Sequence, residues 1–171
     1  GGCIHDCWKL ELNESTLFAK IAPLQSFPML YFEAEGLKRL NSLADSKYLN
    51  IPLPITLQKS NNLSILLLPW INFSNGSQVS LGRGLAKLHQ YSKNQKLFGW
   101  EIDGYIGSTP QLQGFSESWG DCFTNLRLRP QFQLAQKWGL KIKKLDDFLS
   151  EIRYHIEAHN PIPSMVHGDL W

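Results

Sequence analysis

The chain lacks the features that would place it in a membrane or in an oxidising compartment. Its longest purely apolar stretches, such as residues 65–68, fall far short of the roughly 20 residues that span a bilayer. No basic segment followed by an apolar one opens the printed sequence, as a secretory signal would. Its three cysteines, odd in number and without metal-type pairing, are typical of a reducing environment. We therefore expect a cytoplasmic protein that does not interact with membranes.

The chain also lacks a strong charge of one sign and a recognisable metal or nucleophile motif. Its formal net charge is +2, and its basic residues are scattered apart from a small group at 141–144 that a solvated helix face explains. Nucleic-acid binding would need a clustered basic face, so we do not expect it. The histidines and cysteines show no metal-ligand spacing, and nothing resembles a nucleophile elbow.

The pattern of apolar and polar residues in the first 70 positions predicts a β-β-α-β-β order of elements. Residues 3–22 alternate apolar and polar side chains around a turn at 13–15, which predicts a hairpin. Apolar residues in 29–44 recur at spacings of three to five, which predicts a helix. Residues 55–57 and 64–68 then form a second pair of strands. The sheet should therefore consist mainly of antiparallel hairpins.

After Pro69 the pattern becomes mainly helical. Helices are predicted over residues 81–91, 119–138 (interrupted near Pro130) and 145–159, while residues 93–118 read as a long ordered loop. The 171 residues suffice for one domain or one and a half. We predict an α+β, bilobal, protein-kinase-like fold, with a small antiparallel-sheet lobe over 1–70 and a mainly helical lobe over 71–171. Both ends look cut, so we expect a piece of a longer enzyme.

A lysine and a glutamate in the sheet lobe form the first candidate site. Lys20 lies inside an apolar strand and needs a partner, and a strand lysine paired with a helix glutamate is how kinases hold the α- and β-phosphates. Glu33 shares a helical face with apolar residues four and seven positions later. Glu35 is rotated from it by about 200°, at roughly 100° per residue, towards solvent. The spacing therefore favours Glu33 as the partner of Lys20.

Three further segments could bind a nucleotide or carry the chemistry. Gly1 and Gly2 precede a strand and could let backbone amides approach phosphates, although two such glycines are also what an expression scar leaves. Residues 65–71 end the sheet lobe as an apolar, extended segment suited to an adenine. At the other end, Asp169 follows His167 and Gly168 in the way a phosphotransferase catalytic loop reads, with the aspartate as proton acceptor.

Taken together, these motifs resemble the fructosamine-3-kinase (ketosamine kinase) family, within the aminoglycoside-phosphotransferase and protein-kinase-like group. The segments that carry the resemblance are residues 1–4, 18–20, 32–37, 81–89, 98–111, 119, 127–131 and 167–171. The run Tyr-Ile-Gly-Ser-Thr-Pro-Gln at 105–111 is not shared by protein kinases generally, so it is the most specific of them.

The resemblance implies transfer of the γ-phosphoryl group of ATP to the sugar O3 hydroxyl of a ketoamine. Ribulosamine and erythrulosamine would be favoured over fructosamine, the product would decompose, and the role would be deglycation repair of small ketoamines or glycated lysines. Asp169 would be the base, and Lys20 and Glu33 would position the phosphates. The remaining residues implied at the nucleotide are Gly1, Gly2, Cys3, Leu68, Pro69, Trp70 and Ile71. Those implied at the substrate are Tyr105, Gly107, His167 and Trp171.

The family's magnesium ligands follow the catalytic loop, so they would lie beyond residue 171. We therefore expect the complete protein to be active with ATP and Mg²⁺ and the 171-residue chain alone to be inactive. Some family members look to use the position of Cys3 to link two chains by a disulfide. For this chain, Cys3 as a redox switch and Cys3 as an unreactive loop cysteine both stay open. The oligomeric state also stays open between a monomer and a homodimer linked through Cys3.

Two alternatives remain open from the sequence. One is a small-molecule kinase that acts on aminoglycosides or choline-like amines. Acidic residues lining the substrate side would favour this alternative, and residues 98–120 contain Glu101, Asp103 and Glu117 as their acidic residues. The other is a non-catalytic kinase-like protein that binds a partner or senses redox state.

Overall fold

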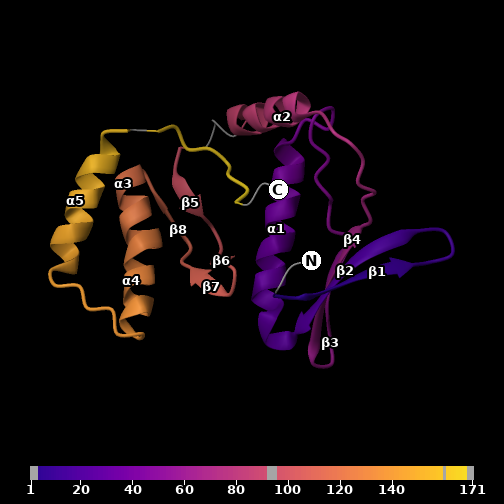
Figure 1. Ribbon diagram of the computed structural model, residues 1–171, viewed down its shortest axis with the longest axis horizontal. Helices are drawn as coiled ribbons and strands as arrows, with labels where there is room; N and C mark the ends of the chain where they lie inside the picture. Colours follow the sequence, from indigo (N-terminus) through magenta and orange to yellow (C-terminus); the bar gives the residue numbers. More distant parts are fainter. Residues whose placement is uncertain (1–3, 92–95, 160, 169–171) are drawn as a thin grey trace. The chain divides into compact units, whose positions relative to one another are not determined.

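The structure is a computed structural model that describes residues 4–91, 96–159 and 161–168. The chain divides into two compact units, residues 1–92 with 165–171, and residues 93–164. Figure 1 traces the order of the elements along the chain. The lobe boundary that we place near residue 70 concerns the complete fold and stays a prediction. None of the described helices has both the length and the apolar character needed to cross a membrane.

The first unit is built on a four-stranded sheet in which every neighbouring pair is antiparallel. The spatial order is β1-β2-β4-β3, so two hairpins join along β2 and β4. The strands are β1 (Asp6–Glu11), β2 (Thr16–Pro23), β3 (Thr56–Ser60) and β4 (Leu63–Pro69). This arrangement confirms the predicted hairpins and the β-β-α-β-β order.

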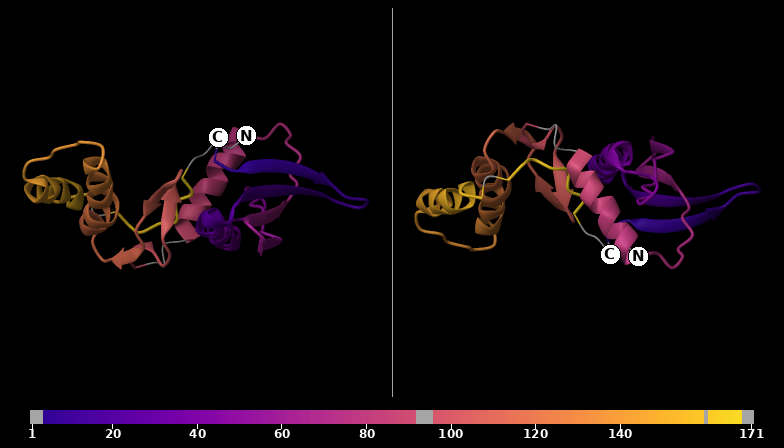
Figure 2. Two further views of the ribbon diagram at one scale, coloured as in Figure 1. Left: turned by 90° about the horizontal axis from the view of Figure 1, so that it is seen from below. Right: turned by 90° about the horizontal axis from the view of Figure 1, so that it is seen from above.

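One helix covers one face of this sheet and creates the core of the unit. A short turn, η1 (Leu24–Ser26), leads from β2 into α1 (Phe27–Leu43), and Figure 2 views α1 along its axis from its two ends. Pro28 stands in the first turn of α1, where its missing N–H costs no helical bond. The core cluster consists of Ala22, Leu30, Ala34, Leu66 and Leu68, with Phe18, Leu37 and Leu57 packed against it. The predicted helix over 29–44 is thus confirmed.

A second helix, α2 (Gln78–Tyr91), packs on the segment that follows α1. Gly84 allows a close approach, because a Cβ built there would lie 2.5 Å from Leu49 Cγ. An ion pair reinforces the contact, with Lys87 Nζ 2.5 Å from Asp45 Oδ2. Hydrogen bonds from Lys87 and from the Lys47 backbone N–H hold the pKa of the Asp45 carboxyl below its ordinary value.

The second unit contains two small antiparallel ribbons, so the prediction that residues 93–118 form a long ordered loop without strands is wrong for residues 98–116. β5 (Phe98–Trp100) pairs with β8 (Gly114–Ser116), and β6 (Gly104–Ile106) pairs with β7 (Thr109–Gln111). Three-residue strands are too short to show a period of two in sequence. Close backbone approach also requires glycine here: Gly99 has φ +116°, and a Cβ on it would lie 2.0 Å from the Gly114 carbonyl oxygen.

The rest of the second unit is helical. One continuous helical stretch comprises α3 (Trp119–Asp121), the π-helical η3 (Cys122–Leu128) and α4 (Arg129–Gln136), and α5 (Leu145–Glu157) follows. The interruption predicted near Pro130 takes the form of the π-helical turns that precede the proline, and the stretch ends at residue 136 instead of 138.

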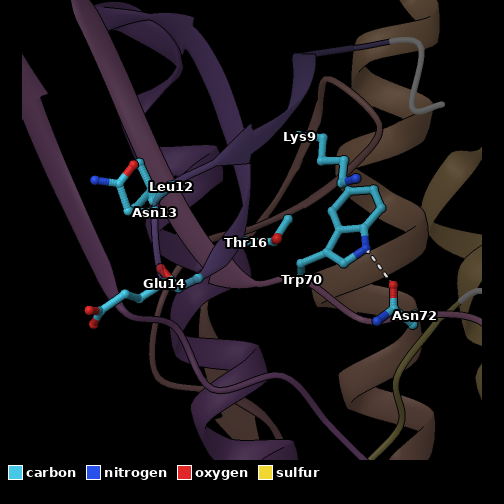
Figure 3. A pocket seen from close by; sticks show the side chains of 8 residues that line it. Lys9, Leu12, Asn13, Glu14, Thr16, Trp70 and Asn72 are labelled. Atoms are coloured by element: carbon cyan, nitrogen blue, oxygen red, sulfur yellow. Dashed lines mark hydrogen bonds between the residues drawn. The ribbon is translucent and has the colours of Figure 1, made fainter.

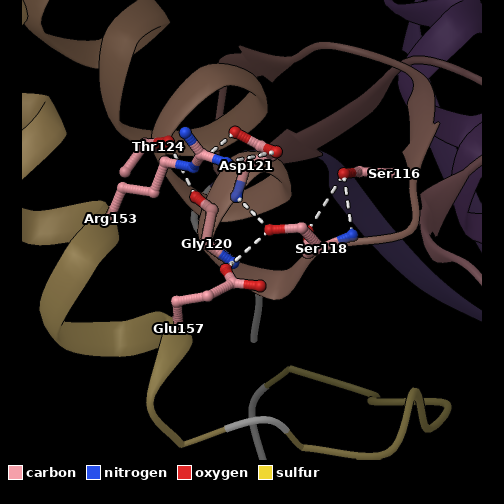
Figure 4. A network of polar contacts seen from close by, with 7 residues as sticks. All are labelled: Ser116, Ser118, Gly120, Asp121, Thr124, Arg153 and Glu157. Carbon is pink, nitrogen blue, oxygen red and sulfur yellow. Dashed lines mark hydrogen bonds and ion pairs between the residues drawn. The ribbon is translucent and has the colours of Figure 1, made fainter.

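A polar network joins the start of this helical stretch to α5, as Figure 4 shows. Ser118 caps the helix by accepting from the Asp121 N–H at 3.0 Å. Glu157 accepts from the Ser118 hydroxyl and the Gly120 N–H at 2.6 and 2.9 Å, which places a carboxylate at the helix N-terminus. Arg153 adds an ion pair with Asp121 at 2.8 Å. The helix is therefore fixed at its N-terminal end by charge-assisted contacts.

Candidate functional site

The Lys20 and Glu33 side chains meet on the sheet face that α1 covers. Lys20 Nζ donates to Glu33 Oε1 at 2.6 Å, and the two side chains are 24% and 29% exposed. Glu35, in contrast, pairs with Lys38 one turn along the same helix. The pairing predicted from helical spacing is confirmed as a contact, while its role towards a phosphate stays a prediction.

The register of the hairpin explains which side chains flank this pair. Cys7 lies opposite Lys20 in the β1–β2 ladder, and Lys9 lies opposite Phe18. Directly opposed side chains share one face of a sheet. Because Phe18 packs on the core under α1, Cys7 and Lys9 face the same side as Lys20. Lys9 also forms an ion pair with Glu11, and that hydrogen bond holds the pKa of the Glu11 carboxyl below its ordinary value.

The expected adenine segment begins at the end of β4. Leu68 belongs to the buried core cluster, Pro69 ends the strand, and the Trp70 N–H donates to the Thr16 carbonyl at 3.3 Å. Ile71 makes no hydrogen bond with the described residues, so its N–H is available to a base. An apolar wall and a free backbone donor are the features that an adenine requires of such a segment.

Within this segment, the Trp70 side chain lies between Lys9 and Asn72, as Figure 3 shows. Its Nε1–H donates to Asn72 Oδ1 at 3.0 Å, and the Lys9 ammonium lies 5.3 Å from the indole centroid. The Phe18 ring lies 6.4 Å away and is tilted by 40°. Together with the β1–β2 turn, Lys9, Trp70 and Asn72 line an open, mainly polar hollow of about 510 Å³.

The predicted residues near the end of the chain are described only in part. His167 is half-buried, and Gly168 is exposed with φ +82°, a left-handed conformation that favours glycine. Asp169, the predicted base, lies outside the described residues. The other predicted residues outside the described ranges are Gly1, Gly2, Cys3 and Trp171. The roles assigned to all of these residues stay predictions.

Tyr105 and Gly107 lie in the second unit, on the β6–β7 hairpin. Tyr105 is opposite Pro110 in the ladder, and the hairpin turns at residues 107 and 108. Gly107 has φ +60° at the first turn position, as tight hairpin turns of this length require. The run recognised in the sequence as most specific thus folds as one compact hairpin, and its role towards a substrate stays a prediction.

The first unit fits an ATP phosphate group through Lys20, whose ammonium is already fixed by Glu33, and a base through the Ile71 N–H. Among the described residues, no group of three or more histidine, cysteine, aspartate or glutamate side chains could hold a metal ion. The roles of Lys20 and Ile71 towards a nucleotide stay predictions, as do the magnesium ligands expected beyond residue 171.

Sequence reasoning missed two residues of the first unit that shape the surroundings of the site. The alternation over residues 3–22 assigned Lys9 no role, whereas the register places Lys9 on the sheet face that α1 covers. Asn72 had no signal of its own, because only the fold brings its amide to the Trp70 indole. Strand register is a tertiary property, and the alternation along one strand does not reveal which side faces the helix.

An antiparallel sheet, a helix packed on it and a strand lysine paired with a helix glutamate define a partial kinase-like α+β fold. The chain belongs to the fructosamine kinase family, because the model of that family matches residues 1–171.

Relatives and solved structures agree with this assignment. A protein of Synechocystis described as a probable ketoamine kinase is 33% identical over 174 residues, covering 100% of this chain and 58% of that protein. A second protein so described, from Escherichia coli K12, is 29% identical, with 59% of it covered. The crystal structure of a Haemophilus somnus protein assigned as a fructosamine-3-kinase superposes with a TM-score of 0.84 at 27% identity, covering 98% of this chain and 57% of that one. A Thermobifida fusca structure, at 23% identity and TM-score 0.74, shares the fold. The chain thus spans somewhat more than half the length of these relatives.

Proposed function

We propose that the complete protein is an ATP-dependent ketoamine kinase. It phosphorylates the O3 hydroxyl of the sugar in a ribulosamine, erythrulosamine or fructosamine attached to an amine, and so initiates deglycation. Membership of the fructosamine kinase family supports the reaction class. The observation that carries the proposal within this chain is the Lys20–Glu33 pair on the face under α1. The bilobal arrangement of the complete fold and a cytoplasmic location belong to the same proposal.

In this reaction the O3 oxygen forms a bond to the γ-phosphorus, and the bond from that phosphorus to the β,γ-bridging oxygen breaks to release ADP. Lys20 binds the α- and β-phosphate oxygens, and Glu33 holds the ammonium in place with a contact of 2.6 Å. Asp169 accepts the proton of the O3 hydroxyl. Magnesium supplies charge neutralisation at the phosphates through ligands expected beyond residue 171.

The test is an ADP-release assay on the protein expressed from its complete coding sequence, with a ribulosamine of N-acetyl-lysine as substrate. Phosphorus NMR then identifies the phosphorylated hydroxyl. Wild type should release ADP only when the ketoamine is present. Glu33→Gln should lower kcat/KM by roughly 10²-fold, because misplacing a catalytic contact by about 1 Å costs that much. Glu35→Gln is the matched control on the same helix, since Glu35 forms its ion pair with Lys38 and not with Lys20, and its kcat/KM should stay near that of wild type.

Three results would contradict the proposal. The first is absence of ketoamine-dependent ADP release, and the second is an equal loss in the two glutamate variants. The third is phosphorylation of an aminoglycoside such as kanamycin in preference to every ketoamine, which would make the protein an aminoglycoside-type kinase. An aminoglycoside kinase would need acidic groups at its substrate side. One of them, Asp103, already forms a hydrogen bond within the chain, because its Oδ1 accepts from the Gln113 N–H at 2.8 Å.

A further inference from the structure

A single nitrogen of Arg127 ties the helical stretch of the second unit to its β-ribbons. Arg127 Nη1 donates to the Leu112 carbonyl at 2.9 Å and to the Leu126 carbonyl at 3.0 Å. The two carbonyls belong to different segments. Leu126 is in the same helical stretch as Arg127, whereas Leu112 lies in the link between β7 and β8. One guanidinium nitrogen therefore bridges two chain segments with both of its hydrogens.

The π-helical segment and the following proline explain how this bridge arises. In η3 the hydrogen bonds span five residues, as in the bond from the Arg129 N–H to the Thr124 carbonyl. Pro130 has no N–H, so it donates to neither the Asn125 nor the Leu126 carbonyl. The Leu126 carbonyl accepts from the Arg127 side chain instead. The proline thus removes a helical donor at the place where the arginine supplies one.

Two further contacts hold the same ribbons against the helix. Gln131 Nε2 lies 3.4 Å from the Pro110 carbonyl, which belongs to β7. Leu126 packs on Gly114 of β8, where an added Cβ would lie 3.2 Å from Leu126 Cδ1. These contacts surround the Arg127 bridge. On the ribbon side, Asp103 also binds the link that follows the β6–β7 hairpin, by accepting from the Gln113 N–H at 2.8 Å. On the helical side, Arg127 connects the helical stretch to that link through the Leu112 carbonyl. Release of Arg127 should therefore loosen the hairpin without unfolding the helix.

We propose that Arg127 is a positioning residue for the ketoamine, which acts by fixing the β6–β7 hairpin that carries Tyr105 and Gly107. This inference rests on the proposed function, since it assigns that hairpin to the substrate and not to ATP. It predicts a selective effect: loss of the bridge weakens the apparent binding of the ketoamine and leaves that of ATP unchanged.

The experiment compares Arg127→Gln, Arg127→Lys and Arg129→Gln in the complete protein. Arg127→Gln should raise the KM for the ribulosamine roughly tenfold and leave the KM for ATP within about twofold, because two hydrogen bonds to carbonyls are lost. Arg127→Lys keeps a charged donor without the planar guanidinium, so its KM should fall between those of wild type and Arg127→Gln. Arg129→Gln removes a guanidinium two residues away that pairs with Asp146 at 2.6 Å, and it should change neither KM.

Amide hydrogen exchange over residues 104–112 gives a readout that does not depend on activity. Arg127→Gln should speed exchange there by roughly tenfold while Arg129→Gln does not. Equal effects on the two substrates, or equal effects of the two arginine variants on the ketoamine KM, would overturn the inference. Unchanged exchange in Arg127→Gln would overturn it as well. A wild-type protein inactive on every ketoamine would instead refute the proposed function, and the exchange experiment would still decide whether Arg127 holds the hairpin.

Discussion

Two glycines in α2, Gly82 and Gly84, should respond in opposite ways to replacement by alanine. Both lie in the interior of the helix, so each replacement gains up to about 1 kcal/mol of helix propensity. A Cβ at Gly82 meets nothing within 4 Å, whereas a Cβ at Gly84 would lie 2.5 Å from Leu49 Cγ and 2.9 Å from Tyr48 Cβ. Leu49 is 8% exposed, and the Tyr48 Cβ is fixed directly to the backbone, so neither atom yields easily.

The magnitude follows from these distances. Overpacking a well-packed site costs about 1–3 kcal/mol, and the gain in helix propensity is common to both variants. Gly82→Ala should therefore raise the free energy of unfolding by up to about 1 kcal/mol. The difference between the two variants isolates the overpacking cost, so Gly84→Ala should be about 1–3 kcal/mol less stable than Gly82→Ala.

Urea unfolding of the complete protein, followed by far-UV circular dichroism, measures both free energies, provided that the m-values agree. The double variant Leu49→Ala/Gly84→Ala tests the mechanism, because shortening Leu49 removes the nearest clash. The two substitutions should then be non-additive, with a favourable coupling of at least about 0.5 kcal/mol. Equal stabilities of Gly82→Ala and Gly84→Ala would refute the packing of α2 on residues 48 and 49.

Two further predictions concern titrating groups. Asp45→Asn should destabilise the protein at neutral pH by removing the ion pair with Lys87. Because the folded-state pKa of Asp45 is lowered from 3.8, this stabilisation is complete above that value and is lost as the pH falls through the lower folded value. Urea midpoints of wild type and variant should thus converge in acid, and a gap that persists there would contradict the pair's role. Burial raises the pKa of the Cys122 thiol, so native Cys122 should react with iodoacetamide far more slowly than half-buried Cys7, with the difference abolished in urea. Peptide mapping by mass spectrometry checks this, and equal native rates would be incompatible with the burial of Cys122.

Local pattern was sufficient wherever one element carried the whole signal. The spacing of apolar residues in the first helix singled out Glu33 over Glu35, because a helix repeats every 3.6 residues whatever surrounds it. The hairpins of the sheet followed from alternation and turn residues. In the same way, the run at 105–111 identified the family before its shape was known, and that run proved to be a hairpin closed by Gly107.

Contacts between distant segments were beyond the reach of the sequence. Alternation along β1 separates Trp8 from Lys9, but only pairing with β2 shows that Lys9 lies on the sheet face that α1 covers and Trp8 on the opposite face. The ribbons of residues 98–116 were missed because three-residue strands are too short to show an alternation of apolar and polar side chains. They also depend on a close backbone contact between two glycines, Gly99 and Gly114, which the sequence does not reveal. The bond from Arg127, in the π-helical turns before Pro130, to the Leu112 carbonyl joins residues 15 positions apart in the chain. Sequence determined the family, the longer helices and the strands of the first unit, because these depend on local periodicity and on recognisable motifs. Register, helix–sheet facing and side-chain bridges were decided by tertiary structure, since each depends on residues far apart in the chain.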